Sequence, residues 1–167
     1  MTVRHAVDAD CHDLFLWRND PVTRANSFNQ DAIDYAHHQK WFRGALAKSS
    51  WVILIGEKGG ESVGMVCYKT LADAVDSATV SINLNPHCRG QGLGKWLLRE
   101  ADACFADGFR RESTEKDTLA NGKIIAEVKV ANTPSIRLFT NANYEVKNTD
   151  EITGVITFEK GFVIYEK

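Results

Sequence analysis

The stretch NPHCRGQGLGKWLL, residues 85–98, places three glycines between an arginine and an apolar segment with helical spacing. Backbone positions without side chains let consecutive N–H groups approach an anion, and the N-terminus of the following helix adds a partial positive charge. A Walker loop does not fit, because Arg89 stands where its first glycine is required. A dinucleotide fingerprint does not fit either, because Gly90, Gly92 and Gly94 occupy alternate positions. The stretch therefore predicts another kind of phosphate-binding loop, or a tight turn from a strand into a helix.

The spacing Arg/Gln-x-x-Gly-x-Gly/Ala, between a strand and an amphipathic helix, fits residues 89–94. Here the chain resembles the N-acetyltransferases of the GNAT superfamily, in which this loop binds the pyrophosphate of acetyl-CoA. The resemblance implies an acetyl-CoA-dependent N-acetyltransferase, with Arg89 and Lys95 strengthening the anion site. Asn132 matches a family asparagine on the cofactor arm, and it also fits a plain helix cap. The resemblance assigns these residues to the cofactor: Leu84, Arg89, Gly90, Gln91, Gly92, Leu93, Gly94, Lys95, Asn132, Ser135 and Phe139.

Length, composition and charge bound the class of protein. The chain has 167 residues, 44% hydrophobic and 25% charged, and these values are typical of one globular domain, which we expect to span residues 1–167. A formal net charge of -2 leaves no basic excess, so we expect no nucleic-acid partner. No apolar run has the length of a signal peptide or membrane helix, so we expect a cytoplasmic protein without a membrane partner. The cysteines lack metal-ligand spacing, and we expect no metal.

Hydrophobic periodicity predicts a mixed α/β layer. The predicted strands cover residues 2–7, 51–57, 62–69, 78–85, 123–130, 144–147 and 155–166, and the predicted helices cover residues 8–19, 34–48, 93–105 and 132–142. The resemblance implies the GNAT fold, with a mixed, mostly antiparallel central sheet of about seven strands, about four helices, and a splay between strands 4 and 5. The polar residues 111–122 are predicted as an exposed loop, either a plain surface connection or a flap near the adenine end of the cofactor.

Acetyl transfer from a thioester to an amine develops negative charge on the carbonyl oxygen, so the site must donate a hydrogen bond there. In the GNAT superfamily a backbone N–H of the bulged strand before the loop does this, which points to Leu84 or Asn85. The candidate general bases are Glu127, on the strand facing the cleft, and His38, on the second helix. Each has an alternative interpretation, Glu127 as a solvated strand residue and His38 as a packed helix residue.

The predicted general acid departs from the family pattern. Many GNAT members place a tyrosine at the position of Phe139, and its hydroxyl protonates the departing thiolate. Because Phe139 has no hydroxyl, we expect that water or Tyr144 supplies the proton, or that protonation follows departure.

The acceptor side resembles a narrower branch of ribosomal-protein and sugar-nucleotide N-acetyltransferases, through Arg18-Asn19 and His38-x-x-Trp41-Phe42. Within this branch the segment EVKVANTPSIRLFTNANYEV, residues 127–146, is most similar to the pseudaminic-acid pathway N-acetyltransferases of UDP-linked 4-amino sugars. The first two helices roof the acceptor in this family. The candidate acceptor contacts are Trp17, Arg18, Asn26, Phe28 and Trp41.

Three functions stay open from the residues alone. The first is acetylation of a small-molecule amine, the 4-amine of a nucleotide-linked amino sugar, which favours an arginine clamp and an aromatic platform. The second is acetylation of a protein N-terminus, which favours an open acidic groove and is kept open by six N-terminal aspartates, Asp8, Asp10, Asp13, Asp20, Asp31 and Asp34. The third is a non-catalytic acyl-CoA-binding sensor. The protein is expected to be a monomer or a homodimer.

Overall fold

The computed structural model describes residues 1–71, 74–112 and 121–163. A seven-stranded sheet lies at its centre, in the order β1-β2-β3-β4-β5-β7-β6. The strands are β1 Thr2–His5, β2 Trp51–Lys58, β3 Glu61–Leu71, β4 Ala74–Leu84, β5 Asn121–Lys129, β6 Glu145–Asp150 and β7 Val155–Val163. The helices are α1 Cys11–Asn19, α2 Pro21–Asn26, α3 Tyr35–Leu46, α4 Leu93–Glu112 and α5 Thr133–Asn141, with 3-10 turns η1 Asp8–Asp10 and η2 Pro86–Cys88.

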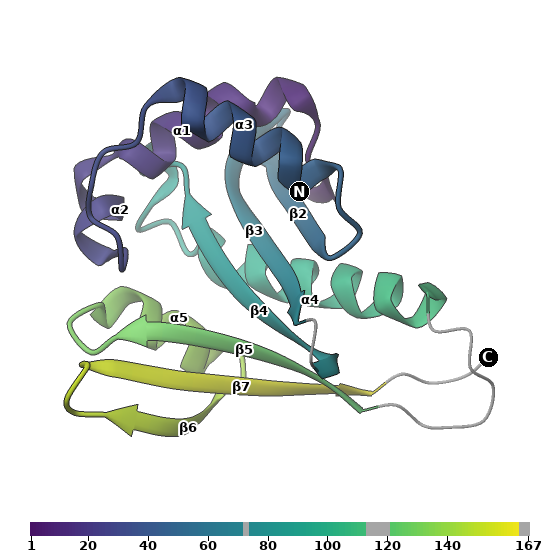
Figure 1. The fold of residues 1–167 in the computed structure, drawn as a ribbon, viewed down its shortest axis with the longest axis vertical. Helices are drawn as coiled ribbons and strands as arrows, with labels where there is room; N and C mark the ends of the chain where they lie inside the picture. The colour runs from purple at the N-terminus through teal and green to yellow at the C-terminus, as the bar shows by residue number, and fades with distance from the viewer. Residues whose placement is uncertain (72–73, 113–120, 164–167) are drawn as a thin grey trace.

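The central strands β4 and β5 are parallel neighbours that part from each other. They pair over Ser77–Thr79 and Lys123–Ile125, and every other strand pair of the described residues is antiparallel. Figure 1 shows the two strands diverging toward the side on which α2 and α5 lie. The predicted mixed, mostly antiparallel sheet and the splay between its fourth and fifth strands are therefore confirmed.

Helices cover both faces of the sheet because the strands alternate. On β4 the side chains of Val80, Ile82 and Leu84 belong to one hydrophobic core, whereas Ser81 and Asn83 point to the opposite face. The α4 core comprises chiefly Leu54, Val66, Tyr68, Leu97, Leu98, Phe105, Phe139 and Phe158. The α1 core on the other face comprises Ala6, Cys11, Leu14, Trp17, Phe42, Ala45, Ile53, Ile55 and Cys67.

Several predicted boundaries need correction. The first predicted helix is a 3-10 turn followed by α1, and the carboxylate of Asp8 pairs with Arg43. The second correction is α2, because the predicted helices cover residues 8–19 and 34–48 and leave residues 21–26 without a predicted element. Asp20 instead caps α2 by accepting from the Thr23 amide at 2.9 Å, and Pro21 occupies its first turn, where a missing N–H costs nothing.

The predicted exposed loop over residues 111–122 is also too long. Helix α4 runs on to Glu112 and β5 begins at Asn121, so helix and strand include both ends of the predicted loop. The remaining residues, 113–120, lie outside the described residues.

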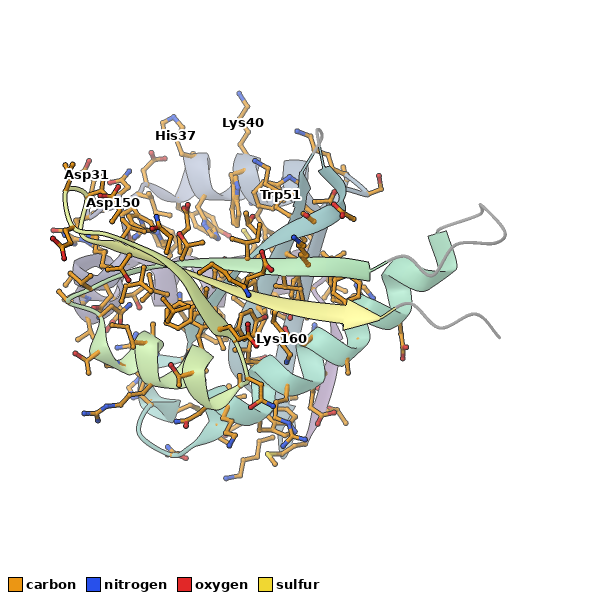
Figure 2. The ribbon with its side chains drawn as sticks, turned by 90° about the horizontal axis from the view of Figure 1, so that it is seen from below. Asp31, His37, Lys40, Trp51, Asp150 and Lys160 are labelled. Atoms are coloured by element: carbon orange, nitrogen blue, oxygen red, sulfur yellow. The ribbon has the colours of Figure 1, made fainter. Side chains whose placement is uncertain are left out.

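A buried polar network ties α4 to the sheet. Asp102 on α4 is buried, and its Oδ1 accepts from the hydroxyls of Tyr68 at 2.6 Å and Tyr144 at 2.9 Å. Its Oδ2 accepts from Nζ of Lys160 at 2.8 Å, and Figure 2 shows Lys160 on the side of β7 that faces α4. The network satisfies a charge that would be costly to bury alone.

Replacing Asp102 by alanine is expected to lower the free energy of unfolding by about 3 kcal/mol, because it leaves a partly buried ammonium and two buried hydroxyls without this partner. Tyr144→Phe removes one hydrogen bond and is expected to cost only about 1 kcal/mol. Urea unfolding monitored by circular dichroism measures both. Equal effects of the two substitutions would contradict this account of the network.

Candidate active site

The glycine loop has the backbone conformation that its sequence suggests. Gly90 and Gly92 adopt φ of 74° and 75°, a region that residues with a side chain rarely enter, and a Cβ at either would meet open space. Gly94 serves packing instead, since a Cβ there would lie 3.3 Å from Cδ1 of Leu84 on β4. The loop thus leaves its backbone uncovered on one side and brings the start of α4 against the sheet.

Helix α4 begins at Leu93, directly after the glycines. The first N–H groups of a helix lack partners within it and favour an anion. Lys95 and Arg137 supply cationic side chains to the same cleft. Arg89 is differently placed, because its Nη1 lies 2.7 Å from Oδ2 of Asp20 and its Nη2 donates to the Thr23 hydroxyl at 2.7 Å.

A cleft of about 570 Å³, here called the loop cleft, lies in front of these groups. Nine of the predicted cofactor residues line it: Leu84, Arg89, Gly90, Gly92, Leu93, Gly94, Lys95, Asn132 and Ser135. Two others do not, since Gln91 donates to the His87 carbonyl at the surface and Phe139 is 3% exposed in the α4 core. Asn132 is also the cap of α5, with its side-chain oxygen accepting from the Ser135 amide at 3.2 Å.

The hydrogen bonds between β3 and β4 engage one of the two predicted oxyanion donors and leave the other outside this strand pair. The amide of Asn85 donates to the Val63 carbonyl at 3.0 Å, and its side chain bonds to His87 and Ser62. Because successive peptide groups of a strand point to opposite sides, the Leu84 amide faces away from β3, toward the opening beside β5. Leu84 also lines the loop cleft. This geometry favours Leu84 as the oxyanion donor and gives Asn85 a structural role.

A second cavity, of about 580 Å³, lies under the N-terminal helices and is called the roof cavity. Its walls are Leu14, Arg18, Thr23, Ser27, Asn29, Ile33, His37, His38, Trp41, Met65, Ser81, Ile82 and Asn83. Of the five predicted acceptor contacts, Arg18 and Trp41 line it. Trp17 is 5% exposed in the α1 core, Phe28 is exposed at the surface, and Asn26 lines the loop cleft instead.

His38 is the predicted base that lies at the roof cavity. Its Nε2 is 3.1 Å from the carbonyl oxygen of Cys11, and because a carbonyl can only accept, the neutral ring carries its proton on Nε2 and leaves Nδ1 basic. Burial, together with the charge of Arg18, lowers the pKa of His38 below its ordinary 6.5 despite that bond. The ring is therefore neutral at pH 7, as a general base must be.

The other candidates for proton transfer lie outside both cavities. Glu127 is exposed on the face of β5 that carries Lys129, and it lines neither cavity. The hydroxyl of Tyr144 donates to Asp102 in the core, and burial raises its pKa. These placements give no support to the predicted roles of Glu127 and Tyr144.

The two cavities share a wall made by α2 and β4. Thr23, Ser27, Ile82 and Asn83 line both. None of these four was predicted as a site residue, although the alternation of β4 and the cap-plus-proline signal of Asp20-Pro21 could have indicated them.

The comparison with protein families adds the decisive observation. The model of the acetyltransferase (GNAT) domain matches residues 1–145. The chain belongs to the GNAT acetyltransferase family. It is an acetyl-CoA-dependent N-acetyltransferase. No curated protein matches the chain.

Solved structures with the same fold are distant in sequence. A ribosomal-protein-alanine N-acetyltransferase from Brucella melitensis aligns with a TM-score of 0.74 and 22% identity, covering 96% of this chain and 99% of its own. A phosphinothricin acetyltransferase from Sinorhizobium meliloti, in complex with acetyl-CoA, aligns with a TM-score of 0.75 and 18% identity, covering 96% of this chain and 87% of its own. A spermidine N-acetyltransferase from Vibrio cholerae, in complex with CoA and spermine, aligns with a TM-score of 0.76 and 13% identity, covering 97% of this chain and 94% of its own. At these identities the likeness shows the shared fold.

The residues of the loop cleft fit acetyl-CoA. The uncovered glycine loop and the start of α4 suit the pyrophosphate, Lys95 and Arg137 add positive charge, and the opening beside β4 suits an extended arm that bonds to main chain. When bound, acetyl-CoA supplies the activated acetyl group. Within the described ranges no helix is long and apolar enough to cross a membrane, and no group of three or more His, Cys, Asp or Glu side chains could hold a metal.

Replacing Gly92 by tryptophan is expected to weaken acetyl-CoA binding by more than about tenfold, because the ring would fill the open space in front of the loop. Gly92→Asn is the matched control, since asparagine tolerates a positive φ better than other residues with a side chain. Isothermal calorimetry gives both affinities, and circular dichroism checks the fold. Unchanged affinity in the tryptophan variant would refute the assignment of the loop.

Acidification below pH 6.5 is expected to lower both kcat/KM and the free energy of unfolding. Because the pKa of His38 is lower in the folded chain than in the unfolded one, the unfolded chain binds the proton first as the pH falls, and the native state loses stability. His38→Gln removes the titrating group and should abolish this part of both pH profiles, with kcat reduced by about 10²-fold or more. A glutamine variant with wild-type kcat would exclude His38 as the base.

Proposed function

We propose that the protein transfers the acetyl group of acetyl-CoA to the primary amine of an anionic small molecule, the 4-amine of a nucleotide-linked amino sugar. The single observation that carries this proposal is Arg18 in the wall of the roof cavity. Its Nη2 donates to the Asn29 carbonyl at 2.8 Å, whereas its buried Nη1 has no hydrogen-bond partner among the described residues. A buried donor without a partner costs about 1–3 kcal/mol, and more when the group is charged.

An anionic oxygen of the acceptor would supply that missing partner. The guanidinium presents several donors in a rigid fork, which suits a diphosphate or a carboxylate. Among its described wall residues the roof cavity has no aspartate or glutamate, and it has two histidines beside Arg18. Arg18 would repel a polycationic acceptor, and the amines of such an acceptor would find no carboxylate partner in the described wall.

None of the six N-terminal aspartates lines the roof cavity, and four of them are held by ion pairs or helix caps. Asp8 pairs with Arg43, Asp10 accepts from both Nη atoms of Arg4, and Asp34 caps α3. Asp20 caps α2 and pairs with Arg89. These carboxylates serve helix ends and ion pairs, and none of them lines the roof cavity.

The size and rim of the roof cavity also suit a nucleotide sugar. Its volume of about 580 Å³ falls within the range of about 300–1,000 Å³ that is common for small-molecule sites. Trp41 is 40% exposed at this cavity, where its ring packs edge-on against Trp51 with centroids 5.9 Å apart. A partly exposed indole held in this way can stack on a nucleobase.

In the proposed mechanism this chain contributes mainly position. The Leu84 amide donates a hydrogen bond where negative charge develops on the thioester oxygen. Nδ1 of His38 accepts the proton of the attacking amine, directly or through water. Holding the amine and the thioester in line is worth up to about 7–11 kcal/mol, more than one acid or base supplies, so the lack of a tyrosine at position 139 is tolerable.

A panel of acceptors tests the proposal through release of the CoA thiol. We expect turnover with UDP-linked 4-amino-6-deoxy sugars, weaker turnover with the same sugar lacking its nucleotide, and none with spermidine. Arg18→Gln should raise KM for the nucleotide sugar by about tenfold or more and leave KM for the free sugar unchanged. Arg43→Gln, which removes an exposed arginine of α3, is the control. Turnover of spermidine, with no turnover of any nucleotide sugar, would overturn the proposal.

A further inference from the structure

Helix α2 lies across the opening between β4 and β5 and is tied to both of its sides. On the β4 side, the Thr23 hydroxyl donates to Oδ1 of Asn83 at 3.2 Å. On the β5 side, the Ser27 carbonyl at the end of α2 accepts from Nζ of Lys129. In Figure 1 α2 lies on the side toward which the two strands diverge. Since Thr23 and Ser27 line both cavities, the position of α2 defines their common wall.

The strongest tie of α2 comes from the glycine loop. Arg89 pairs with Asp20 at 2.7 Å and donates to the Thr23 hydroxyl at 2.7 Å, so one guanidinium contacts both the cap and the first turn of the helix. Both charged side chains are partly buried, at 29% and 17% exposure. Burial alone would raise the pKa of Asp20, but hydrogen bonds from the Thr23 amide and Arg89 outweigh it and hold this pKa below its ordinary value. The carboxylate is therefore charged, and it neutralises Arg89.

We propose that Arg89 is a positioning residue that holds α2 across the two cavities, and not chiefly a ligand of the pyrophosphate. Its guanidinium is already engaged by Asp20 and Thr23, whereas Lys95 and Arg137 line the same cleft and carry the charge that a pyrophosphate needs. By fixing the shared wall, Arg89 sets where the acceptor amine meets the thioester. This inference rests on the proposed assignment of the two cavities.

The test separates positioning of α2 from binding of acetyl-CoA. Asp20→Asn is the chosen variant, because asparagine caps a helix as well as aspartate and only the ion pair is lost. We expect the amides of residues 22–27 to exchange with deuterium about tenfold faster, and the Kd of acetyl-CoA, from calorimetry, to change by less than about twofold. Lys95→Gln should do the opposite, weakening acetyl-CoA binding without faster exchange in α2. Asp8→Asn removes the exposed pair with Arg43 and is the matched control.

A double-mutant cycle supplies the outcome that would overturn the inference. If Arg89 acts through Asp20, the effects of Asp20→Asn and Arg89→Gln on exchange in α2 are not additive, because either substitution removes the same interaction. If Arg89→Gln weakens acetyl-CoA binding as strongly as Lys95→Gln and leaves exchange in α2 unchanged, Arg89 is a pyrophosphate ligand and the inference is wrong.

Activity with a UDP-linked 4-amino sugar provides an independent readout. Asp20→Asn should lower kcat and raise KM for the acceptor, and Thr23→Val should act in the same direction while Thr23→Ser, which keeps the hydroxyl, restores turnover. If no acceptor of this class is acetylated at all, the proposed substrate is wrong, but the exchange and calorimetry results still decide the role of Arg89.

Discussion

The early end of the pairing between β4 and β5 shapes everything around the site. After Thr79 and Ile125 the two strands separate, and the edge of β4 that faces away from β3 has no partner strand. Backbone N–H and C=O groups need partners when they are shielded from water, so this edge is prepared for a molecule that offers main-chain-like bonds. The Leu84 amide lies on that edge, directly before η2 and the glycine loop. The same divergence opens the two cavities and leaves a gap for α2 to bridge.

The cationic side chains around the opening differ in whether a carboxylate neutralises them. Lys95 and Arg137 at the loop cleft have no carboxylate among the described wall residues, whereas Arg89 is neutralised by Asp20. Arg18 stands alone in an otherwise uncharged wall of the roof cavity, apart from its histidine neighbours. An arginine paired with a carboxylate holds structure in place, whereas Arg18, whose Nη1 has no partner among the described residues, has a donor left for a ligand.

Two tyrosine hydroxyls form hydrogen bonds inside the core. Tyr68 and Tyr144 both donate to Asp102, and Phe139 packs edge-on against Tyr144 with ring centroids 5.0 Å apart. This arrangement stabilises the contact of α4 and α5 with the sheet, and neither tyrosine lines the loop cleft or the roof cavity. Chemistry at the site then depends on orientation, and so on the stiffness of the strands and of α2.

Local sequence patterns predicted the elements whose causes are local. Periodicity predicted residues 78–85 as a strand, which is β4, and Asn132 predicted the cap of α5. The glycine loop could be predicted because its requirement, a bare backbone before a helix, is written in consecutive residues. Helix α2 was missed because its six residues show little periodicity and because the helix, with its C-cap, is tied to Asn83, Arg89 and Lys129, which are far along the chain.

The sequence by itself determined the mixed α/β class and the glycine loop, since periodicity, caps and glycines act over a few residues, and the resemblance carried by residues 89–94 implied the GNAT fold. Tertiary structure alone decided that the Leu84 amide faces the opening, because this depends on which amides of β4 bond to β3. It also decided that Arg89 forms an ion pair, because its partner Asp20 is distant in the chain. It also decided that Tyr144 is internal. These outcomes depend on how strands and helices meet in space, which no short stretch of residues encodes.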